Sequence, residues 1–154
     1  MDNNDVLRRL RYTFDFDDSK MIELFGLADL TVTRPKVSEW LKRDDHPEKQ
    51  NLLDVELAAF LNGLITHNRG KKEGVEIINE RILNNNMILR KLKIALSFKD
   101  DDMMEIFDLA NIRISKHEIS AFFRNPKQNQ YRRCEDQFLR NFLLGLSLKF
   151  RDNT

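Results

Sequence analysis

The sequence predicts an all-α protein, and three observations support this fold class. Gly and Pro, which interrupt helices, number only 5 and 3 among the 154 residues. Apolar residues recur at spacings of three and four along much of the chain, as on one face of a helix. The sequence also repeats itself without a gap at an offset of 82 residues, from residue 4 to residue 65. The chain is therefore predicted to be a tandem duplication of one unit of four short helices.

The repeat is specific, because 18 of its 62 aligned positions are identical. The first-copy residues that recur 82 positions later are Asn4, Leu7, Arg8, Leu10, Phe16, Asp18, Met21, Glu23, Phe25, Leu27, Ala28, Ser38, Asp54, Leu57, Phe60, Leu61, Gly63 and Leu64. A unit of about 60 residues buries little surface by itself, so we expect the copies to pack as one compact pseudo-symmetric helical body. The predicted divisions are a first repeat at 4–65, a linker and connecting helix at 66–85, and a second repeat at 86–150.

The first helix of each copy is predicted at residues 4–14 and 86–97, where apolar side chains fall on one face. The second helix begins at an acidic cluster, near Asp17 in the first copy and at residues 100–102 in the second. Carboxylates there can cap free N–H groups and favour the positive end of the helix dipole. Three successive Asp residues at 100–102 also suggest a cation site, but at a helix start their side chains splay apart, which favours capping.

The third helix is predicted to start at Thr33 in the first copy and at Ser115 in the second. Ser115 and Glu118 have the spacing of a capping box, and Ile114 and Ile119 have that of a hydrophobic staple. A polar loop containing a Pro follows this helix in each copy and ends it.

The fourth helix has apolar residues at helical spacing in both copies, and it carries Gly63 and Gly145 at the same interior position. Because Gly is unfavourable inside a helix, its recurrence predicts that another helix approaches closely there. Residues 70–74 are the predicted linker. The apolar residues between positions 77 and 83 predict that the chain becomes helical again before Asn84.

Composition places the protein in a broad class without naming a partner. The 26 Lys and Arg residues nearly balance the 25 Asp and Glu residues, which gives a net charge of +1. No apolar run reaches transmembrane length, and the first residues lack the pattern of a signal peptide. The single cysteine, Cys134, cannot form an internal disulfide. We therefore expect a cytoplasmic protein that is not a membrane protein.

Three stretches of the sequence carry a family resemblance: LNNNMILRKLKIAL at 83–96, FLNGL at 60–64 and CEDQFLRNFLLGL at 134–146. They resemble the YehS-like family of bacterial proteins, also called domain of unknown function 1456. The resemblance covers nearly the whole chain, including its two copies. It implies a small bacterial cytoplasmic protein, and it implies no activity, cofactor or catalytic residue. Family sequences often have Gly where this chain has Glu135.

The titratable residues give no pattern of a catalytic site. His46, His67 and His117 lie in different predicted segments, and none has a partner at a suggestive spacing. Cys134 is expected to be a buried structural thiol rather than a nucleophile. Motifs for phosphate loops, metalloproteases and serine hydrolases do not occur. The sequence favours a non-enzymatic binding protein, and it indicates no cofactor and no metal.

Nucleic acid is the first partner that the sequence suggests. Residues 86–154 carry 13 basic and 9 acidic side chains, a net charge of +4, whereas residues 1–85 carry −3. Basic residues on the two first helices form matching ridges that could contact phosphates, and Tyr131 could stack on a base. The candidate residues are Arg8, Arg9, Arg11, Arg90, Lys91, Lys93, Arg124, Lys127, Tyr131, Arg132 and Arg133. The alternative, which such a pattern more often reflects, is a solvated face that is balanced by nearby acids.

Two alternatives remain open at this stage. Residues 21–43 loosely resemble a helix-turn-helix, although the connection between the helices is longer than usual and the second helix is expected to bury its apolar residues. The other alternative is a protein–protein adaptor that uses an apolar groove between the repeats. That hypothesis predicts an exposed apolar patch formed by Met21, Phe25, Met103 and Phe107 or similar residues. Such residues more often fill the core between the copies, and the sequence favours that alternative.

Overall fold

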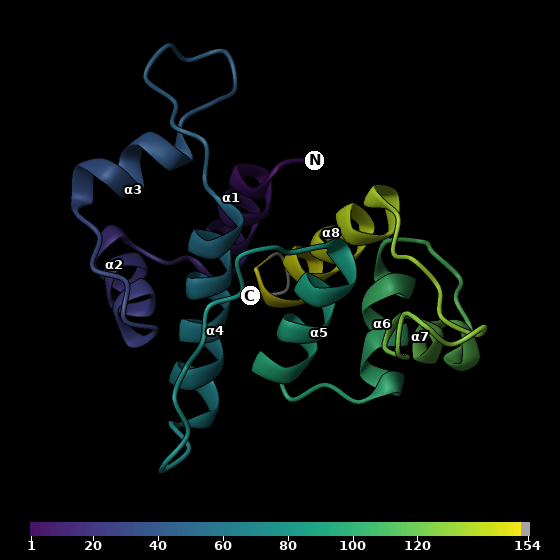
Figure 1. Cartoon of the computed structure of the whole chain (residues 1–154). Helices are drawn as coiled ribbons and strands as arrows, with labels where there is room; N and C mark the ends of the chain where they lie inside the picture. The colour runs from purple at the N-terminus through teal and green to yellow at the C-terminus, as the bar shows by residue number, and fades with distance from the viewer. Residues whose placement is uncertain (152–154) are drawn as a thin grey trace.

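The computed structural model describes residues 1–151, which form eight α-helices and no β-strand (Figure 1). The first repeat contains α1 (Asn3–Phe14), α2 (Asp18–Leu27), α3 (Arg34–Leu41) and α4 (Asp54–Arg69). The second repeat contains α5 (Asn85–Ala95), α6 (Asp100–Leu109), α7 (Lys116–Phe122) and α8 (Asp136–Phe150). The all-α class and the duplicated four-helix unit that the sequence predicts are confirmed.

Side chains cap the helices where the sequence predicts it. At the start of α7, the Glu118 N–H donates to Ser115 Oγ and the Ser115 N–H donates to Glu118 Oε1, both at 3.1 Å. At the start of α6, Asp102 accepts a 2.8 Å hydrogen bond from the Lys99 N–H. The acidic run at 100–102 therefore caps a helix, and its other two carboxylates form ion pairs with lysines.

The repeat extends to the backbone conformation of the turns. Asp15 and Ser97 follow the first helix of each copy with φ values of 53° and 55°. Asp29 and Asn111 follow the second helix with φ values of 64° and 61°. These left-handed conformations are uncommon for residues other than glycine, so their recurrence at the same offset indicates that both copies share one turn geometry.

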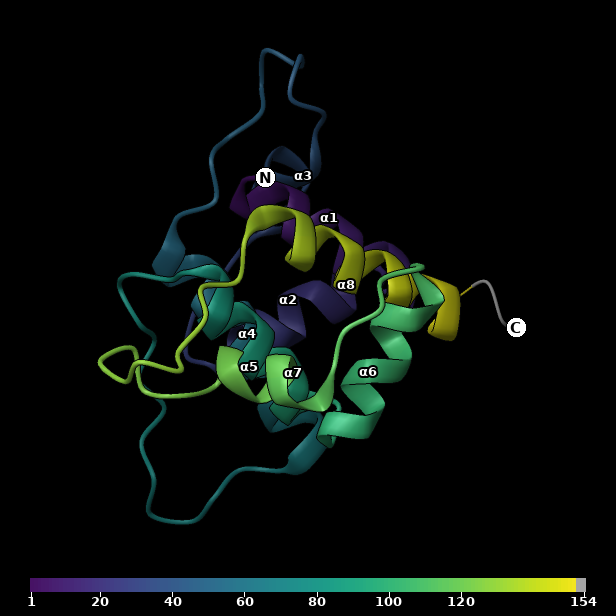
Figure 2. The same ribbon diagram turned by 90° about the vertical axis from the view of Figure 1, so that its right-hand side faces the viewer.

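The two repeats are interleaved rather than placed side by side. The first helix of each copy packs along the fourth helix of the other copy, so that α1 lies beside α8 and α5 lies beside α4 (Figures 1 and 2). The paired helices run parallel: the Met1 amine meets Asp136 near their starts, at 3.2 Å, and Arg151 donates to the Tyr12 carbonyl near their ends, at 2.7 Å. This exchange of helices relates the copies by a pseudo-two-fold axis.

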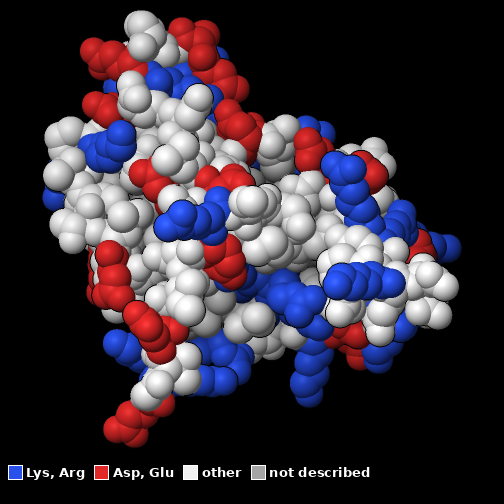
Figure 3. Space-filling model, viewed as in Figure 1, with Lys and Arg blue, Asp and Glu red and all other residues white. Residues whose placement is uncertain are grey.

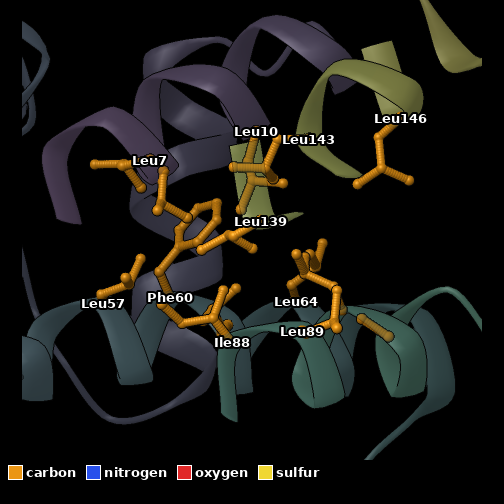
Figure 4. Packing of buried hydrophobic residues seen from close by; sticks show 14 of the residues in the cluster. Leu7, Leu10, Leu57, Phe60, Leu64, Ile88, Leu89, Leu139, Leu143 and Leu146 are labelled. Carbon is orange, nitrogen blue, oxygen red and sulfur yellow. The ribbon is translucent and has the colours of Figure 1, made fainter. Parts of the chain in front are cut away.

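One hydrophobic core fills the space between the four paired helices (Figure 4). Both repeats contribute to it, and its central residues are Leu7, Leu10, Leu57, Phe60, Leu64, Ile88, Leu89, Leu139, Leu143 and Leu146. Each of these side chains is at least 97% buried. Because helices of both copies bury their apolar faces here, neither repeat completes a core by itself.

The recurring glycines of the fourth helix mark close helix crossings. A Cβ atom at Gly63 would overlap the backbone carbonyl of Leu24 in α2. A Cβ atom at Gly145 would overlap the carbonyl of Ile106 in α6 in the same way. The predicted close approach is therefore confirmed in both copies.

A buried asparagine on the first helix of each copy holds the loop that leads into the fourth helix. Asn4 Nδ2 donates to the carbonyls of Trp40 (2.9 Å) and Gln50 (2.8 Å), and its Oδ1 accepts from the Leu52 N–H (3.0 Å). Asn86 makes the same three bonds, at 2.8–3.0 Å, with the residues 82 positions further along: Phe122, Arg132 and Cys134. We call these the Asn4 bridge and the Asn86 bridge. They satisfy backbone groups that have no partner in regular secondary structure.

The predicted connecting helix within 66–85 is wrong. Helix α4 continues to Arg69, and residues 70–84 are irregular, with Ile78 and Ile82 76% and 77% exposed. The reason is geometric: α5 runs parallel to α4, so the chain must first return along the whole of α4, about 24 Å for its length. Residues 70–74 reverse the chain, and the residues from 75 to 83 would span only about 14 Å as a helix, so they cover the distance in an extended path. We call residues 75–83 the strap.

The predicted apolar patch is also wrong. Met21, Phe25, Met103 and Phe107 are all fully buried in the core. The rings of Phe25 and Phe107 pack on Phe60 and its counterpart in α8 at centroid distances of 5.3 and 5.4 Å. Within residues 1–151, no helix combines the length and apolar character that crossing a bilayer requires.

Candidate functional site

The basic residues of α1 are largely neutralised by neighbouring acids. Arg8 forms ion pairs with Asp5 and, at 3.6 Å, with Asp44. Arg11 lies 3.9 Å from Asp18. The first of the two predicted basic ridges thus carries little uncompensated charge, except at Arg9.

The loop after α3 adds further acids beside this ridge. Lys49 Nζ lies 2.9 Å from Asp2 and 2.6 Å from Asp44, and the hydrogen bond with Lys49 lowers the pKa of the Asp44 carboxyl. Asp2, Asp5 and Asp44 come close enough together to hold a cation. Because Lys49 and Arg8 already occupy the space between these carboxylates, the cluster is a salt-bridge network rather than a metal centre.

Arg9 and its counterpart Lys91 differ in their surroundings. Lys91 Nζ forms an ion pair of 2.6 Å with Glu80 in the strap and a hydrogen bond of 2.7 Å to Asn62 Oδ1. Arg9 makes no ion pair or side-chain hydrogen bond with any residue in the described part of the chain, and it lines a groove between α1 and α8.

The basic residues of the second repeat form a pocket around an aromatic ring. Arg90 donates to the Phe123 carbonyl at 2.7 Å, and Lys93 Nζ lies 4.6 Å from the centre of the Phe123 ring. Arg69, at the end of α4, donates to Ser97 Oγ at 2.7 Å. Together with Ile94 and Phe98, these residues line an open pocket of about 390 Å³. We call it the cationic pocket.

The charge of the cationic pocket is only partly compensated. Lys93 pairs with Asp100 at 2.9 Å. Arg90 and Arg69 instead donate to carbonyl and hydroxyl oxygens, and neither has a carboxylate partner among residues 1–151. A neutral acceptor leaves the charge of a guanidinium uncompensated, so these two arginines remain available to an anion.

The remaining predicted site residues lie in and after the loop that follows α7. Arg132 forms a 2.9 Å ion pair with Glu118 and stacks 4.7 Å from the ring of Phe138, so its role is structural. Tyr131 and Arg124 are half-buried, and Lys127 and Arg133 are exposed. None of the five residues predicted here, Arg124, Lys127, Tyr131, Arg132 and Arg133, lines the cationic pocket.

Sequence reasoning missed Arg69, Phe98 and Phe123. Arg69 lies within the predicted linker region, and nothing in its sequence context indicates that it meets α5. The parallel packing of α5 on α4 brings it there. The sequence indicated only weakly that Phe123 belongs to a site, because its counterpart in the first copy, Leu41, is not aromatic.

The groups most often used in catalysis are dispersed or inert. The three histidines His46, His67 and His117 are exposed and belong to different segments. Cys134 is buried, and burial raises the pKa of its thiol to about 12, with the negative charge of Asp136 adding to the effect. A thiol of this kind is not ionised at neutral pH and is a poor nucleophile. The interpretation of Cys134 as a structural residue agrees with its position.

The helix-turn-helix alternative finds little support in the geometry of α3. Val37 and Trp40 are buried against the core, and Lys36 Nζ lies 5.5 Å above the Trp40 ring. Helix α3 has only eight residues, and one face of it is fixed to the first repeat.

The fold and its repeated contacts define an all-α protein built from two interleaved copies of one unit. The chain belongs to the family described as Protein of unknown function (DUF1456), whose model matches residues 3–70 and 85–152. It is 39% identical over 148 residues to the Uncharacterized protein YehS of Escherichia coli (strain K12), an alignment that spans 96% of this chain and 95% of that protein. The resemblance seen in the sequence is therefore confirmed. No solved structure gives a significant match.

Glu135 is the position at which the family resemblance leads us to expect glycine. Glu135 lies just before α8 with a φ of −68°, a conformation open to every residue type. The backbone therefore does not require glycine at this position.

Proposed function

We propose that this protein is a non-enzymatic, cytoplasmic binding protein that contacts single-stranded nucleic acid through the cationic pocket of its second repeat. The observation that carries the proposal is the grouping of Arg69, Arg90 and Lys93 around the ring of Phe123. Single strands are commonly held by cations along the phosphates and by aromatic rings on which bases stack. RNA and DNA share both features, so the proposal covers either strand.

The charge distribution favours the second repeat over the first. In Figure 3, basic side chains gather around α5 and over the second repeat, while acidic side chains surround the loop at the top of the first. Arg8, the counterpart of Arg90, is paired with Asp5 and Asp44. The first repeat also has Leu41 where the second has Phe123, so it offers no ring for stacking.

The binding of a labelled single-stranded RNA of mixed sequence, measured by fluorescence anisotropy at low and near-physiological salt, tests this proposal. We expect Arg90→Ala with Lys93→Ala to weaken binding about tenfold or more at low salt. The slope of log affinity against log salt should fall by about 0.7 for each phosphate that the variant no longer neutralises. Phe123→Leu should weaken binding with little change in the salt dependence, because it removes stacking and leaves the charges in place.

The matched control is Arg8→Ala with Arg11→Ala, which removes the equivalent residues of the first repeat. Its effect should stay below about threefold, because these arginines are already neutralised by acids. Equal losses from the two pairs, or no loss from either, would show that the cationic pocket is not the binding site. The same titration with a single-stranded DNA and a duplex decides which strand is preferred.

Protein interaction remains the second candidate function, although on a different surface from the one that the sequence predicts. The residues predicted to line the apolar groove are in the core, so that surface does not exist. A different groove, between α1 and α8, supports this candidate instead.

A further inference from the structure

The pseudo-two-fold axis creates two equivalent grooves, and within residues 1–151 another segment of the chain covers only one of them. The first groove lies between α4 and α5, and the strap runs across it (Figure 1). The second lies between α8 and α1, which are side by side below α3 in Figure 2. No residue in the described part of the chain crosses this second groove as the strap crosses the first.

The strap shows how an extended segment fits such a groove. Asn62 Nδ2 reaches the Ile78 carbonyl, Asn79 Oδ1 and Glu80 Oε1 at 3.0–3.4 Å. Glu80 also forms the 2.6 Å ion pair with Lys91. Along the same path, the side chain of Ile77 packs against the core. The attachment therefore combines one carboxylate, one cation and an aliphatic contact.

A second set of contacts ties the strap to α2. Asn79 Nδ2 donates to the carbonyl of Ala28 at 2.9 Å, and Ala28 is fully buried. In the second repeat the equivalent Ala110 is partly exposed, and its neighbour Leu109 is 40% exposed. The side of the second repeat that corresponds to the covered surface is thus left open to solvent.

The open groove has a volume of about 250 Å³ and chemistry related to that of the covered groove. Arg9 replaces Lys91, so a cation with no partner in the described chain stands where the strap's ion pair would form. Leu144 replaces Asn62 and is 43% exposed, and Tyr12 beside it is 51% exposed. Arg8 also lines the groove and Arg151 lies 4.1 Å from the centre of the Tyr12 ring, but both of these arginines form ion pairs with aspartates. The open groove therefore presents one cation without a carboxylate partner in the described chain, Arg9, and a more apolar floor.

We propose that the groove between α1 and α8 binds an extended segment of a partner protein, in which a carboxylate is flanked by aliphatic side chains. The carboxylate pairs with Arg9 as Glu80 pairs with Lys91, and the aliphatic side chains cover Leu144 and Tyr12. The covered groove is the physical precedent, because the same backbone framework already holds a segment of this chemistry. This proposal does not depend on nucleic-acid binding, which uses different residues.

Charge and apolar surface together favour a peptide over other occupants. A phosphate backbone would satisfy Arg9 but would leave Leu144 exposed. Because Arg8 and Arg151 are already paired with aspartates, the uncompensated charge at the groove is that of Arg9, which provides only a small part of the affinity for a nucleic acid. An extended acidic and aliphatic segment satisfies both features, since main-chain groups can lie along the helices while alternate side chains face the groove.

The test uses a fluorescein-labelled peptide with the sequence of the strap, VEIINERIL, added to the full-length chain. We expect saturable binding, with chemical-shift changes in ¹⁵N-labelled protein at Tyr12, Leu144 and Ser147. Arg9→Glu should weaken binding about tenfold or more, because it replaces an attraction with a repulsion. A peptide carrying Lys in place of Glu80 should reverse this preference and bind the Arg9→Glu protein better than the wild type.

The matched control is Arg113→Glu, which makes the same charge change at an exposed arginine outside the groove. It should leave peptide binding within about twofold of the wild type. Absence of binding, or equal binding to wild type and Arg9→Glu, would overturn the proposal. Shift changes confined to Asn62 and Lys91 would also overturn it, because they would mean that the peptide merely exchanges with the strap. Loss of RNA binding in Arg9→Glu with unchanged peptide binding would assign Arg9 to the nucleic-acid surface instead.

Discussion

The two repeats share nearly the same interior packing, but the residues on their surfaces differ. The Asn4 and Asn86 bridges make three equivalent hydrogen bonds. Gly63 and Gly145 lie at equivalent helix crossings, one in each repeat. On the surface, equivalent positions have diverged, as the pair Asn62 and Leu144 illustrates. Interior positions are fixed by packing that both repeats share, whereas surface positions are free to take on separate roles.

The divergence on the surface gives each repeat its own pattern of charge. Near the start of the chain, Arg8 is surrounded by carboxylates, and hydrogen bonds to Asp44 and Asp2 raise the pKa of Lys49. In the second repeat, the counterpart Arg90 lies on Phe123 and has no carboxylate partner among the described residues. A pseudo-symmetric fold can therefore carry asymmetric function, and a search for a site in such a fold should begin where the copies disagree.

The largest expected effect comes from filling either helix crossing. Gly63→Ala and Gly145→Ala each place a Cβ against a backbone carbonyl that cannot move without displacing a helix. We expect each to lower the free energy of unfolding by about 3 kcal/mol or more, or to prevent folding. Urea denaturation measures the loss.

Gly26→Ala is the control for this prediction, because a Cβ at Gly26 meets no atom within 4 Å. Gly26 also lies within α2, where Ala is the better helix former, so this change should raise stability by about 0.5–1 kcal/mol. A strong loss at Gly63 with a neutral result at Gly145 would break the equivalence of the two crossings.

The next effect concerns the asparagine bridges. Asn4→Leu and Asn86→Leu each leave two carbonyl groups and one N–H without their partner in a buried site. We expect each variant to lose about 2–3 kcal/mol of stability, and the two losses to agree within about 1 kcal/mol. Asn51→Ala, at an exposed position in the first repeat, should cost less than about 0.5 kcal/mol. Thermal or urea unfolding of the three variants measures the comparison, and unequal losses at Asn4 and Asn86 would contradict it.

The smallest expected effect on stability concerns the strap, which covers the groove between α4 and α5. Burial acts to raise the pKa of Glu80, but hydrogen bonding and the ion pair with Lys91 outweigh it and hold this pKa below its ordinary value of 4.5. A lowered pKa means that the ion pair stabilises the fold above about pH 4.5 and loses this contribution as the pH falls through the folded-state pKa.

The measurement is the stability of wild type and Glu80→Gln between pH 7 and pH 3. The variant should be less stable by below about 1 kcal/mol at pH 7, because this pair is partly exposed, and the difference should vanish at the acidic end. A difference that persists unchanged at pH 3 would mean that Glu80 acts through packing rather than through its charge.

Local interactions explain why much of the fold could be predicted from the sequence. The helix starts at Ser115 and at the acidic run of α6 depend on side chains within three residues of the backbone groups that they cap. Gly63 and Gly145 predicted close crossings, because a recurrent glycine inside a helix has few other physical explanations. These signals require no knowledge of the partner helix.

The predictions that failed depended on contacts between distant segments. The residues between 77 and 83 have apolar spacing suited to a helix, but Asn62 and Lys91 hold them in an extended path. The exposed patch that the adaptor hypothesis requires is also absent from the described part of the chain, because the packing places Met21 and Phe25 in the core, as the favoured alternative expected.

The candidate sites were less predictable than the fold. Arg90 and Lys93 were identified from the sequence as basic residues of a possible binding surface. The equivalent basic residue Arg8 on α1 is neutralised by Asp5 and Asp44, and the sequence does not indicate that Asp44 lies close to Arg8. Arg69 was missed because it belongs to another helix. A binding surface depends on charged residues that several helices and loops bring together. The spacing of residues along one helix does not predict which residues of other elements will lie beside it.

By itself, the sequence determined that this protein is helical and that it is a duplication. It also indicated which residues cap the helices, which glycines lie at helix crossings and which side chains form the core. Each of these follows from short-range chemistry and from comparing one copy with the other. Only the tertiary structure decided that the repeats exchange their first helices and that α5 runs parallel to α4 and so requires an extended strap. It also decided that the part of the chain described by the structure covers one of two equivalent grooves and not the other. These outcomes depend on the balance of contacts among residues far apart in the chain, which apolar periodicity cannot encode.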